Sequence, residues 1–255
     1  MRLLTLARDL SRRKARERES LFVAEGVRTV EELLRSSIEV AGVLVAPQLA
    51  SVAGGRGDVL LQGIRASGYS IQEVSDREFA SAAGTESPQG VLAIGRIPKR
   101  GLADFAGADP LRLVVLDAVQ DPGNVGTIIR TAAALGAAGT VALPGTVDVW
   151  NAKVVRSSMG AIFTHSAVSA SNEALLAFLR DERIPLWISD MDGDLIGREE
   201  GAPGRLAMAV GNEGAGISTA LREAAARVVS IPMARPVESL NVAVATGILL
   251  HTLRP

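Results

Sequence analysis

Several residue types are missing or scarce in this chain of 255 residues, and each absence narrows its chemistry. The chain has no cysteine, which excludes a disulfide framework, a zinc-thiolate site, an iron-sulfur cluster and a thiol nucleophile. Its only two histidines, His165 and His251, stand far apart in the sequence, so neither a histidine metal site nor a Ser-His-Asp triad is indicated. We therefore expect chemistry that uses no metal.

Long apolar runs and targeting signals are also missing. No apolar run approaches the roughly 18 residues that a membrane span needs. The first ten residues, MRLLTLARDL, hold only a short apolar stretch and no small-residue cleavage site, so a secretory signal is not indicated. A composition of 47% hydrophobic and 22% charged residues is typical of a globular protein. We expect a soluble, cytoplasmic protein without membrane contact, most simply in two domains.

The net charge of -1 conceals an asymmetry between the two ends of the chain. Residues 1–100 carry 15 basic and 12 acidic side chains, whereas residues 101–255 carry 12 basic and 16 acidic ones. Residues 1–18 alone hold seven basic side chains against two acidic ones, a distribution that suits a polyphosphate such as RNA. A solvated helical surface tail is the alternative. The side chains of this arm that we predict to contact RNA are Arg8, Arg12, Arg13, Lys14 and Arg16.

The first hundred residues show the pattern of a small α/β domain. Residues 27–34 place Val27, Val30, Leu33 and Leu34 on one helical face, and the apolar segment 40–46 reads as the buried strand that follows. Short strands are predicted at 68–75 and 90–96, with a short helix at 78–84. The following segment is rich in Gly, Pro and charge, so we predict a domain over residues 1–100 and a linker over 101–110.

Strands and helices alternate regularly over residues 111–255. Strands are predicted at 111–117, 139–143, 165–169, 184–190, 206–211 and 227–232, and helices at 127–135, 151–161, 172–182 and 239–253, with a short helix after 211–216. Such alternation predicts a mainly parallel sheet with helices on both faces. The acidic segment 190–194 resembles a calcium loop, but Leu195 and Gly201 stand where such a loop needs Gly and Glu, so we predict a turn.

The segment DPGNVGTIIRTAAALG, residues 121–136, invites comparison with a dinucleotide-binding turn. That turn requires G-x-G-x-x-G directly after a strand. Here Gly123 and Gly126 are followed by no glycine until Gly136, at the far end of the expected helix, which disfavours a nicotinamide-dependent oxidoreductase. The segment carries polar side chains instead, among them Asn124 and Arg130.

Three polar loops follow predicted strands, at 117–126, 210–216 and 231–241. Ligands of parallel sheets bind outside the carboxyl ends of the strands, where these loops lie. Their motifs, DPGNVGTIIR, GNEGAG and IPM followed by SLN, resemble in order and spacing those of the SpoU family, RNA ribose 2'-O-methyltransferases of the SPOUT superfamily that use S-adenosyl-L-methionine (AdoMet). The segment DVWNAKVVRSSMGA at 148–161 is similar to the family's sequence between the first two motifs. FVAEG at 22–26 and SPQGVLAI at 87–94 resemble the L30e-like substrate-binding domain of rRNA-modifying members.

The resemblance carries expectations about fold and function. It implies a catalytic domain over residues 111–255 with a C-terminal trefoil knot, and a homodimer formed through that domain, to which the apolar helix at 242–253 would contribute. It implies AdoMet-dependent 2'-O-methylation of a ribose in RNA. The L30e-like domain favours large-subunit rRNA of the 23S type over tRNA. The alternatives are a tRNA ribose methyltransferase, and a non-catalytic RNA-binding or ribosome assembly protein.

Five residues form the catalytic set that the resemblance implies. Arg130 would engage the 2'-hydroxyl as base, although a guanidinium is normally only a donor and would then orient the substrate through a phosphate. Asn124 would orient Arg130 or the ribose; its alternative is a turn residue in the left-handed conformation. Glu213 would fix the arginine, or merely compensate a helix start. Ser239 and Asn241 would contact substrate or align Arg130, and Ser239 is also a good N-cap.

The same resemblance implies an AdoMet pocket made largely of backbone from the second and third loops. Glycine lets backbone approach an adenosine closely, and apolar side chains would sandwich the base, with a plain core position as their alternative. The predicted cofactor-binding residues are Gly211, Ile231, Met233 and Leu240. Lys153 and Arg156 are further predicted RNA contacts, and Trp150 beside them either stacks on RNA or packs inside the protein.

Overall fold

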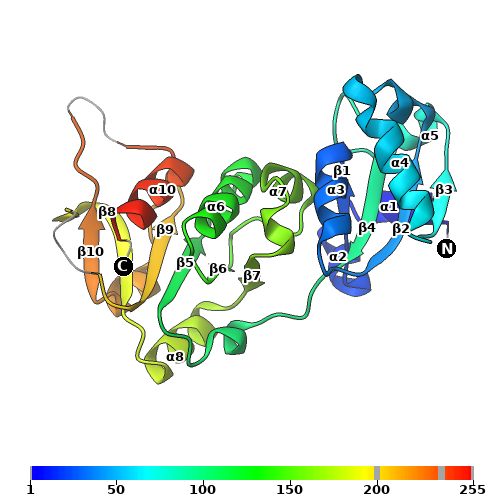
Figure 1. The fold of residues 1–255 in the computed structure, drawn as a ribbon. Helices are drawn as coiled ribbons and strands as arrows, with labels where there is room; N and C mark the ends of the chain where they lie inside the picture. Colours follow the sequence, from blue (N-terminus) through cyan, green and yellow to red (C-terminus); the bar gives the residue numbers. More distant parts are fainter. Residues whose placement is uncertain (1, 198–201, 235–238, 254–255) are drawn as a thin grey trace. The chain divides into compact units, whose positions relative to one another are not determined.

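The computed structural model describes residues 2–197, 202–234 and 239–253 (Figure 1). The chain forms two compact units, one of Met1–Lys99 with Trp150–Thr164 and one of Arg100–Val149 with His165–Pro255. Two segments differ from the sequence-based division. Residues 101–110, predicted as a linker, belong to the second unit, where Phe105 is buried in the core. Residues 150–164, assigned by sequence to the catalytic domain, pack with the first unit.

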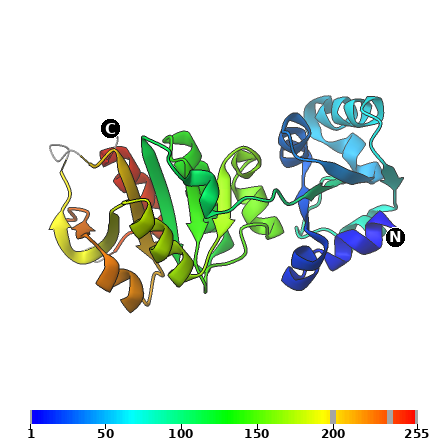
Figure 2. The ribbon, with the colours of Figure 1, turned by 90° about the horizontal axis from the view of Figure 1, so that it is seen from below.

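The first unit is a mixed four-stranded sheet in the order β1-β4-β2-β3. Its strands are β1 (Leu21–Glu25), β2 (Val40–Val45), β3 (Ile71–Glu73) and β4 (Val91–Arg96), with β4 antiparallel to β1 and β2, and β2 parallel to β3. Its helices are α1 (Leu3–Asp9), α2 (Arg13–Glu19), α3 (Val27–Arg35), α4 (Arg56–Ala66), α5 (Asp76–Ala80) and α7 (Ala152–Ser157), with short 3-10 turns η1 (Pro47–Ser51), η2 (Ala53–Gly55) and η4 (Ala161–Phe163). Figure 2 shows α3 and α4 on one side of the sheet and α1 and α2 on the other.

The basic N-terminal arm is folded onto this sheet. Leu4 and Leu10 of the arm are buried in one core cluster with Leu44 and Phe79, so α1 is an integral layer of the unit rather than a solvated tail. The structure also corrects the assignment of Arg16 as an RNA contact. Its side chain is 3% exposed and its Nη1 donates to the carbonyl oxygens of Leu10 and Ser11 at 2.8 and 2.9 Å, which fixes the turn between α1 and α2.

The second unit is the parallel α/β domain that the sequence predicts. Six strands, all parallel, follow the order β10-β8-β9-β5-β6-β7. They are β5 (Leu111–Asp117), β6 (Gly139–Ala142), β7 (Ser166–Ser169), β8 (Leu186–Leu195), β9 (Arg205–Gly211) and β10 (Arg227–Ser230). The helices are α6 (Pro122–Ala134), α8 (Asn172–Asp181), α9 (Thr219–Ala224) and α10 (Val242–Thr252), with the 3-10 turn η3 (Leu102–Phe105).

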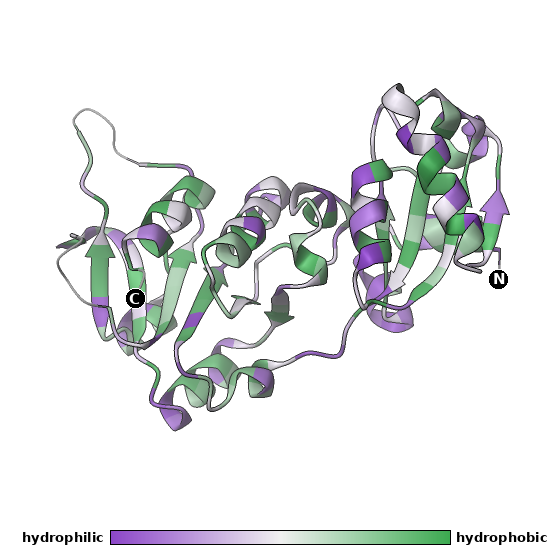
Figure 3. Ribbon diagram, in the orientation of Figure 1, coloured by the Kyte–Doolittle hydropathy of each residue, from purple (hydrophilic) through white to green (hydrophobic). Residues whose placement is uncertain are grey.

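Both faces of this parallel sheet are covered. Helix α6 packs against α10, and α8 packs against α9. Side chains of β5 point alternately to the two faces of the sheet. Leu113 and Val115 point to the face covered by α8 and α9, because they belong to the core cluster that includes Leu175 of α8 and Leu221 of α9. Hydrophobic colours accordingly dominate the central strands in Figure 3, as expected for strands buried on both sides.

Two elements differ from the sequence prediction. Helix α4 (Arg56–Ala66) was not predicted, because two glycines precede it and Gly57 and Gly63 lie inside it. The segment 190–194 is not a turn but part of β8, where Asp194 and Leu195 pair with Val229 and Ser230 of β10. A Cβ at Gly193 would lie 2.7 Å from the backbone of Val229, so glycine is what allows the two strands to approach here.

The buried His165 predicts a specific loss of stability in acid. Its side chain is 6% exposed and its Nε2 lies 2.9 Å from Oγ1 of Thr140. Burial of the imidazole, with a smaller contribution from the Arg100 charge, lowers the pKa of His165 from 6.5 to about 4. Between these two values the unfolded chain binds a proton that the folded chain does not, so stability is full above about pH 6.5 and falls as the pH decreases.

The loss attributable to this one group approaches about 3 kcal/mol at low pH, since each pKa unit corresponds to about 1.4 kcal/mol. Urea unfolding at pH 7.5 and pH 4.5 measures it. His165→Gln keeps a partner for Thr140 but cannot titrate, so we expect the variant to lose less stability on acidification than the unaltered protein. Equal losses in the two proteins would contradict the assignment.

Candidate active site

The first and second predicted loops are fastened to each other at the carboxyl edge of the second unit's sheet. Strands β5 and β9 are neighbours, and Asp117 lies in register with Gly211. The buried Asp117 carboxylate accepts a hydrogen bond from the backbone N–H of Ser218 at 2.6 Å, and Asn212 Nδ2 donates to the carbonyl oxygen of Ala118 at 3.0 Å. Sequence reasoning assigned a role to neither Asp117, the last residue of a predicted strand, nor Asn212, the second residue of the motif GNEGAG.

Asn124 joins all three loops. Its Nδ2 donates to Oε1 of Glu213 at 2.5 Å, and its Oδ1 accepts a hydrogen bond from Nδ2 of Asn241 at 3.0 Å. The partners come from the loop after β9 and from the segment that leads into α10, so one side chain links motifs separated by 89 and 117 positions. We call Asn124, Glu213 and Asn241 the amide network.

Local structure fixes both asparagines of the amide network. Asp121 is the N-cap of α6, and its Oδ1 accepts the backbone N–H of Asn124 at 2.8 Å. Pro122 occupies the first helical position, where its missing N–H costs no hydrogen bond. Asn241 is itself the N-cap of α10, and its Oδ1 accepts from the backbone N–H of Ala243 at 2.9 Å. The amide oxygen of Asn241 is therefore committed to the helix, which leaves its Nδ2 to face Asn124.

This geometry settles three of the alternatives left open by the sequence. Asn124 lies inside α6 and is not in the left-handed conformation. The N-cap of the last helix is Asn241 rather than Ser239. Glu213 lies in a turn rather than at a helix start, and its carboxylate accepts a hydrogen bond from Asn124, while its role in fixing an arginine stays a prediction.

Arg130 stands apart from the amide network. It lies on α6 six residues after Asn124, which places it about 9 Å farther along the axis and about 120° around the helix. The side chain is exposed, and it forms no hydrogen bond or ion pair with any residue in the described ranges. The structure therefore does not bring Arg130 to Asn124 or Glu213, and its guanidinium remains available to a substrate.

A cavity of about 250 Å³ opens beside the amide network. All four predicted cofactor-binding residues line it, together with two of the predicted catalytic set: Gly211, Ile231, Met233, Leu240, Glu213 and Ser239. Val210, Val242 and Ala245 add apolar surface. Ser189, Asp190 and Met191 form one wall of the cavity, and the sequence did not predict them as cavity residues. The reason is that the predicted strand ends at residue 190, whereas β8 continues to Leu195.

The Asp190 carboxylate in this wall is held ionised. Its burial acts to raise the pKa, but the hydrogen bond and charge of Arg222, together with the backbone N–H groups of Asp192 and Met191, outweigh burial and lower the pKa of Asp190. The cavity thus combines apolar surface with a fixed negative charge.

The loop after β9 depends on glycine at both of its ends. The backbones of Asn212 and Gly216 exchange hydrogen bonds of 3.2 and 2.9 Å, which close the loop on itself. A Cβ at Gly211 would lie 2.3 Å from the carbonyl oxygen of Gly216, and Gly216 has a φ of +69° that disfavours other residues. Glycine at 211 is therefore required by the protein's own turn, in addition to any ligand.

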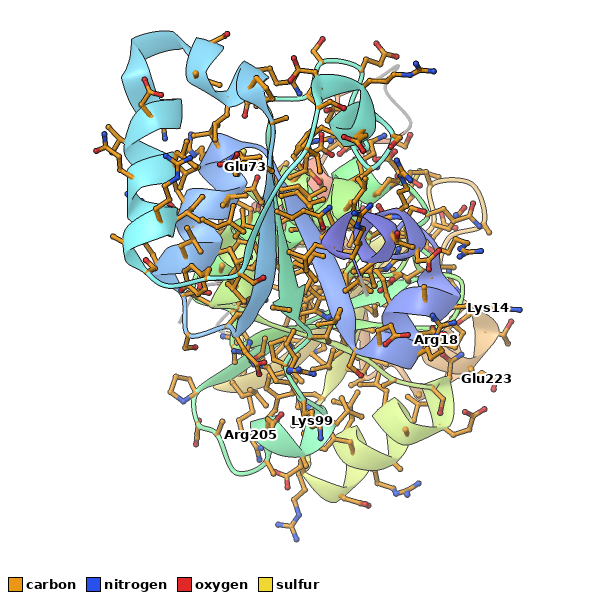
Figure 4. The ribbon with its side chains drawn as sticks, turned by 90° about the vertical axis from the view of Figure 1, so that its right-hand side faces the viewer. Lys14, Arg18, Glu73, Lys99, Arg205 and Glu223 are labelled. Atoms are coloured by element: carbon orange, nitrogen blue, oxygen red, sulfur yellow. The ribbon has the colours of Figure 1, made fainter. Side chains whose placement is uncertain are left out.

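The remaining predicted RNA contacts of the arm lie in the first unit. Arg8 donates to Oγ of Ser81, while Arg12 and Arg13 form exposed ion pairs with Asp9 and Glu17 at 2.5 and 2.7 Å. Exposed pairs of this kind are worth little and yield to a phosphate. Figure 4 shows the Lys14 side chain extending away from α2. The prediction of these four residues as RNA contacts is compatible with their exposure but stays a prediction.

The predicted RNA contacts around α7 differ in their exposure. Lys153 is exposed and Arg156 is partly buried. Trp150 is buried, and its ring centroid lies 4.6 Å from that of Phe22 on β1. Its alternative as a packing residue is therefore the correct one, and it does not stack on RNA.

Metal clusters and membrane helices are both missing from the part of the chain that the structure describes. No group of three or more histidine, aspartate or glutamate side chains there is placed to hold a metal ion. No helix among the same residues is long and apolar enough to cross a membrane.

Fold and site together define a two-unit α/β protein with a loop-built cavity at the carboxyl edge of a parallel sheet. The profile of the SpoU rRNA Methylase family matches residues 112–251, and that of the MRM3-like substrate binding domain matches residues 5–93. The chain belongs to the SpoU rRNA methylase family.

Two relatives illustrate the similarity in sequence. The chain is 32% identical over 247 residues, 97% of its length and 94% of the relative's, to the 23S rRNA (guanosine(2553)-2'-O)-methyltransferase RlmP of Bacillus subtilis (strain 168). It is 39% identical over 171 residues, 66% of its length and 63% of the relative's, to the 23S rRNA (adenosine(1067)-2'-O)-methyltransferase of Streptomyces laurentii.

Solved structures of the same architecture include complexes with AdoMet. The SpoU methyltransferase AviRb from Streptomyces viridochromogenes, in complex with AdoMet, superposes with a TM-score of 0.87 at 27% identity, covering 99% of this chain and 97% of that one. An AdoMet-bound rRNA methyltransferase from Sinorhizobium meliloti has a TM-score of 0.85 at 29% identity, covering 99% and 94%. The predicted fold class, with its small N-terminal α/β domain and parallel catalytic sheet, is confirmed.

Proposed function

We propose that this protein transfers a methyl group from AdoMet to the 2'-oxygen of a ribose in large-subunit rRNA of the 23S type. The observation that carries the proposal is the amide network, which fastens the three loops of the family motifs around one cavity. The two relatives whose names specify 23S rRNA 2'-O-methylation support the substrate class.

The residues of the cavity fit AdoMet. Ile231 and Leu240 offer apolar surface to an adenine, while Ser189 and the ionised Asp190 offer acceptors to ribose hydroxyls. AdoMet supplies an electrophilic methyl group carried on a positively charged sulfur. Glu213, which lines the same cavity and whose Oε1 is held by Asn124, would offer a carboxylate to that positive charge.

Arg130 acts on the substrate rather than on the cavity. A ribose 2'-hydroxyl is a poor nucleophile, so the protein must hold it in line with the methyl group. A guanidinium keeps its proton and can only donate, and Arg130 has no carboxylate partner in the described ranges that would compete with a phosphate. We therefore assign Arg130 to binding the substrate phosphate and orienting the ribose, in preference to the role of base.

The first unit selects the RNA in this proposal. Its match to a substrate binding domain supports that role. The exposed cations that we propose as RNA contacts are Arg8, Arg12, Arg13, Lys14 and Lys153, and the partly buried Arg156 is a further proposed contact. Arg16 is left out because its guanidinium is engaged inside the fold.

Assembly and compartment belong to the same proposal. Val244 and Ile248 of α10 are 53% and 38% exposed, an apolar surface suited to a second copy of the chain. We propose a homodimer formed through this helix, and the trefoil knot that the family resemblance implies for the C-terminal segment. We also propose a cytoplasmic location, which the proposed rRNA substrate supports.

Transfer of labelled methyl from AdoMet to unmodified RNA tests the function directly. Large-subunit rRNA, small-subunit rRNA and tRNA are assayed in parallel, and the labelled nucleoside is identified by mass spectrometry. We expect label at the 2'-oxygen of one nucleotide of large-subunit rRNA. Label only in tRNA would support the tRNA alternative, and RNA binding without transfer to any pool would support a non-catalytic protein.

A further inference from the structure

A second polar cavity, of about 280 Å³, lies within the first unit. Three segments contribute to it: the end of β1 with the start of α3, the stretch between α5 and β4, and α7. The polar side chains that line it include Glu25, Arg28, Thr85, Ser87, Gln89 and Arg156. Arg156 was predicted from the sequence as an RNA contact, and Glu25, Ser87 and Gln89 lie in the segments FVAEG and SPQGVLAI that resemble the L30e-like domain. No individual role in the proposed transfer uses the side chains other than Arg156.

The uncharged and acidic walls of this cavity are held in place by hydrogen bonds. Glu25 is 3% exposed, and its two oxygens accept from the backbone N–H of Gly84 at 2.7 Å and from Oγ1 of Thr85 at 2.5 Å. Gln89 Oε1 accepts from the backbone N–H of Val27 at 2.9 Å. Each carboxylate oxygen of Glu25 retains a further lone pair, and the Nε2 group of Gln89 has no partner in the described ranges. The cavity therefore presents fixed acceptors and a free donor.

Two guanidinium groups line the same cavity without a carboxylate partner. Neither Arg28 nor Arg156 forms an ion pair or hydrogen bond with a residue that the structure describes. Their neighbours do: Arg35 on the same helix as Arg28 pairs with Glu32 at 3.0 Å, and Arg56 pairs with Glu31 at 2.5 Å. The two arginines at this cavity thus outnumber its single carboxylate, that of Glu25.

Packing of α7 keeps Arg156 at the cavity. Helix α7 lies against β1, and Phe22 of β1 contacts both Trp150 and Phe163, with ring centroids 4.6 and 5.8 Å apart. These aromatic contacts flank α7 in the sequence on both sides. Arg156 therefore projects from a fixed helix rather than from a free loop.

We propose that this cavity binds one unpaired nucleotide of the RNA substrate, with its phosphate on Arg28 and Arg156 and its base edge against Glu25, Thr85 and Gln89. Guanidinium forks match phosphate oxygens in geometry as well as charge. The edge of an unpaired base offers donors and acceptors together, as these walls require, whereas the bases of a duplex are already paired. The inference rests on the proposed function and deepens it, since it gives the first unit a base-reading site distinct from the basic arm.

Binding of fluorescent single-stranded RNA tests the site in the full-length protein. Ten-nucleotide oligomers of A, C, G and U are titrated by fluorescence anisotropy at several salt concentrations. The double variant Arg28→Gln/Arg156→Gln is expected to bind about tenfold more weakly and to reduce the slope of log affinity against log salt by about 0.7, because the two arginines together hold one phosphate and each neutralised phosphate of a single strand contributes about 0.7. Gln89→Leu is expected to change the ranking of the four oligomers without changing that slope.

The matched control is Arg65→Gln/Arg77→Gln, which removes two exposed arginines from the same unit that do not line the cavity. An unchanged salt slope in the cavity variant, or an equal change in the control, would overturn the proposal. A third result would also overturn it: the unaltered protein binds the four free nucleoside monophosphates, while the cavity variant keeps its full affinity for the oligomers. That result would indicate a small-molecule site. An unchanged thermal midpoint excludes misfolding as the cause.

Methyl transfer measured with the same proteins separates this inference from the proposed function. The cavity variant is expected to raise KM for large-subunit rRNA and to leave kcat nearly unchanged, because neither arginine belongs to the amide network or lines the cavity of the second unit. If the unaltered protein transfers no methyl group while the variant still loses RNA affinity, the proposed function fails and the cavity stands. If the unaltered protein transfers methyl groups and the variant has an unchanged KM, the proposed function stands and the cavity does not bind the substrate.

Discussion

Replacement of Arg130 by alanine is expected to lower the rate of methyl transfer at saturating RNA by about a hundredfold to a thousandfold, the range found when one positioning donor is removed from an active site. The affinity for AdoMet should remain nearly unchanged. The two expectations follow from the same geometry: Arg130 does not line the AdoMet cavity, and it has no partner within the described ranges whose position it maintains.

The conservative variant and a control distinguish orientation from bulk charge. Arg130→Lys keeps the positive charge but loses the planar fork, so we expect it to recover only part of the rate. Arg180→Ala removes an exposed arginine from α8 on the opposite face of the sheet and should leave transfer unaffected. Single-turnover transfer and isothermal titration with AdoMet measure the two quantities, and near-normal turnover in Arg130→Ala would remove Arg130 from the mechanism.

Periodicity and turn residues were sufficient to predict the parallel sheet of the second unit. The apolar run 111–117 is typical of a central strand in a sheet that is covered on both faces. It forms β5, which lies between β9 and β6. The start of α6 was predicted five residues too late, because Gly123 and Gly126 suggested a loop. The N-cap Asp121 and Pro122 at the first helical position were the better signal, since they satisfy the helix start directly.

The pairing of polar atoms in the site could not be predicted in the same way. The strand order places the three loops at one edge, but it does not determine that Asn124 donates to Glu213 and accepts from Asn241. That arrangement depends on Asn241 committing its oxygen to the cap of α10, a local choice that frees only its Nδ2 group. Similarly, the burial of Trp150 against Phe22 depends on a contact between residues far apart in the sequence, which no local pattern reports.

Because Asn124 both donates and accepts within the amide network, its replacement by aspartate is expected to make methyl transfer depend on pH in a specific direction. The new carboxylate can still accept a hydrogen bond from Nδ2 of Asn241. Its other oxygen, however, takes the place of Nδ2 of Asn124, which lies 2.5 Å from Oε1 of Glu213 in the unaltered protein. Two carboxylates this close cannot both ionise freely, so the pair shares a proton and its higher apparent pKa rises. Above that pKa the two charges repel, and the loop that carries Glu213 moves away from the cavity.

Asn124→Asp should therefore be least active at high pH, about tenfold to a hundredfold below the unaltered protein, since a hydrogen bond to a charged group contributes about 1.5–3 kcal/mol. As the pH falls, the shared proton restores the donor toward Glu213, and the deficit should shrink. Asn124→Ala removes both hydrogen bonds without adding a charge, so its deficit should be the same at every pH. The pH profile of kcat for the three proteins measures this effect. Parallel profiles for the aspartate and alanine variants would show that Asn124 acts without Glu213. A deficit that closes at low pH only for the aspartate variant would show that a proton shared between residues 124 and 213 holds the second loop in place.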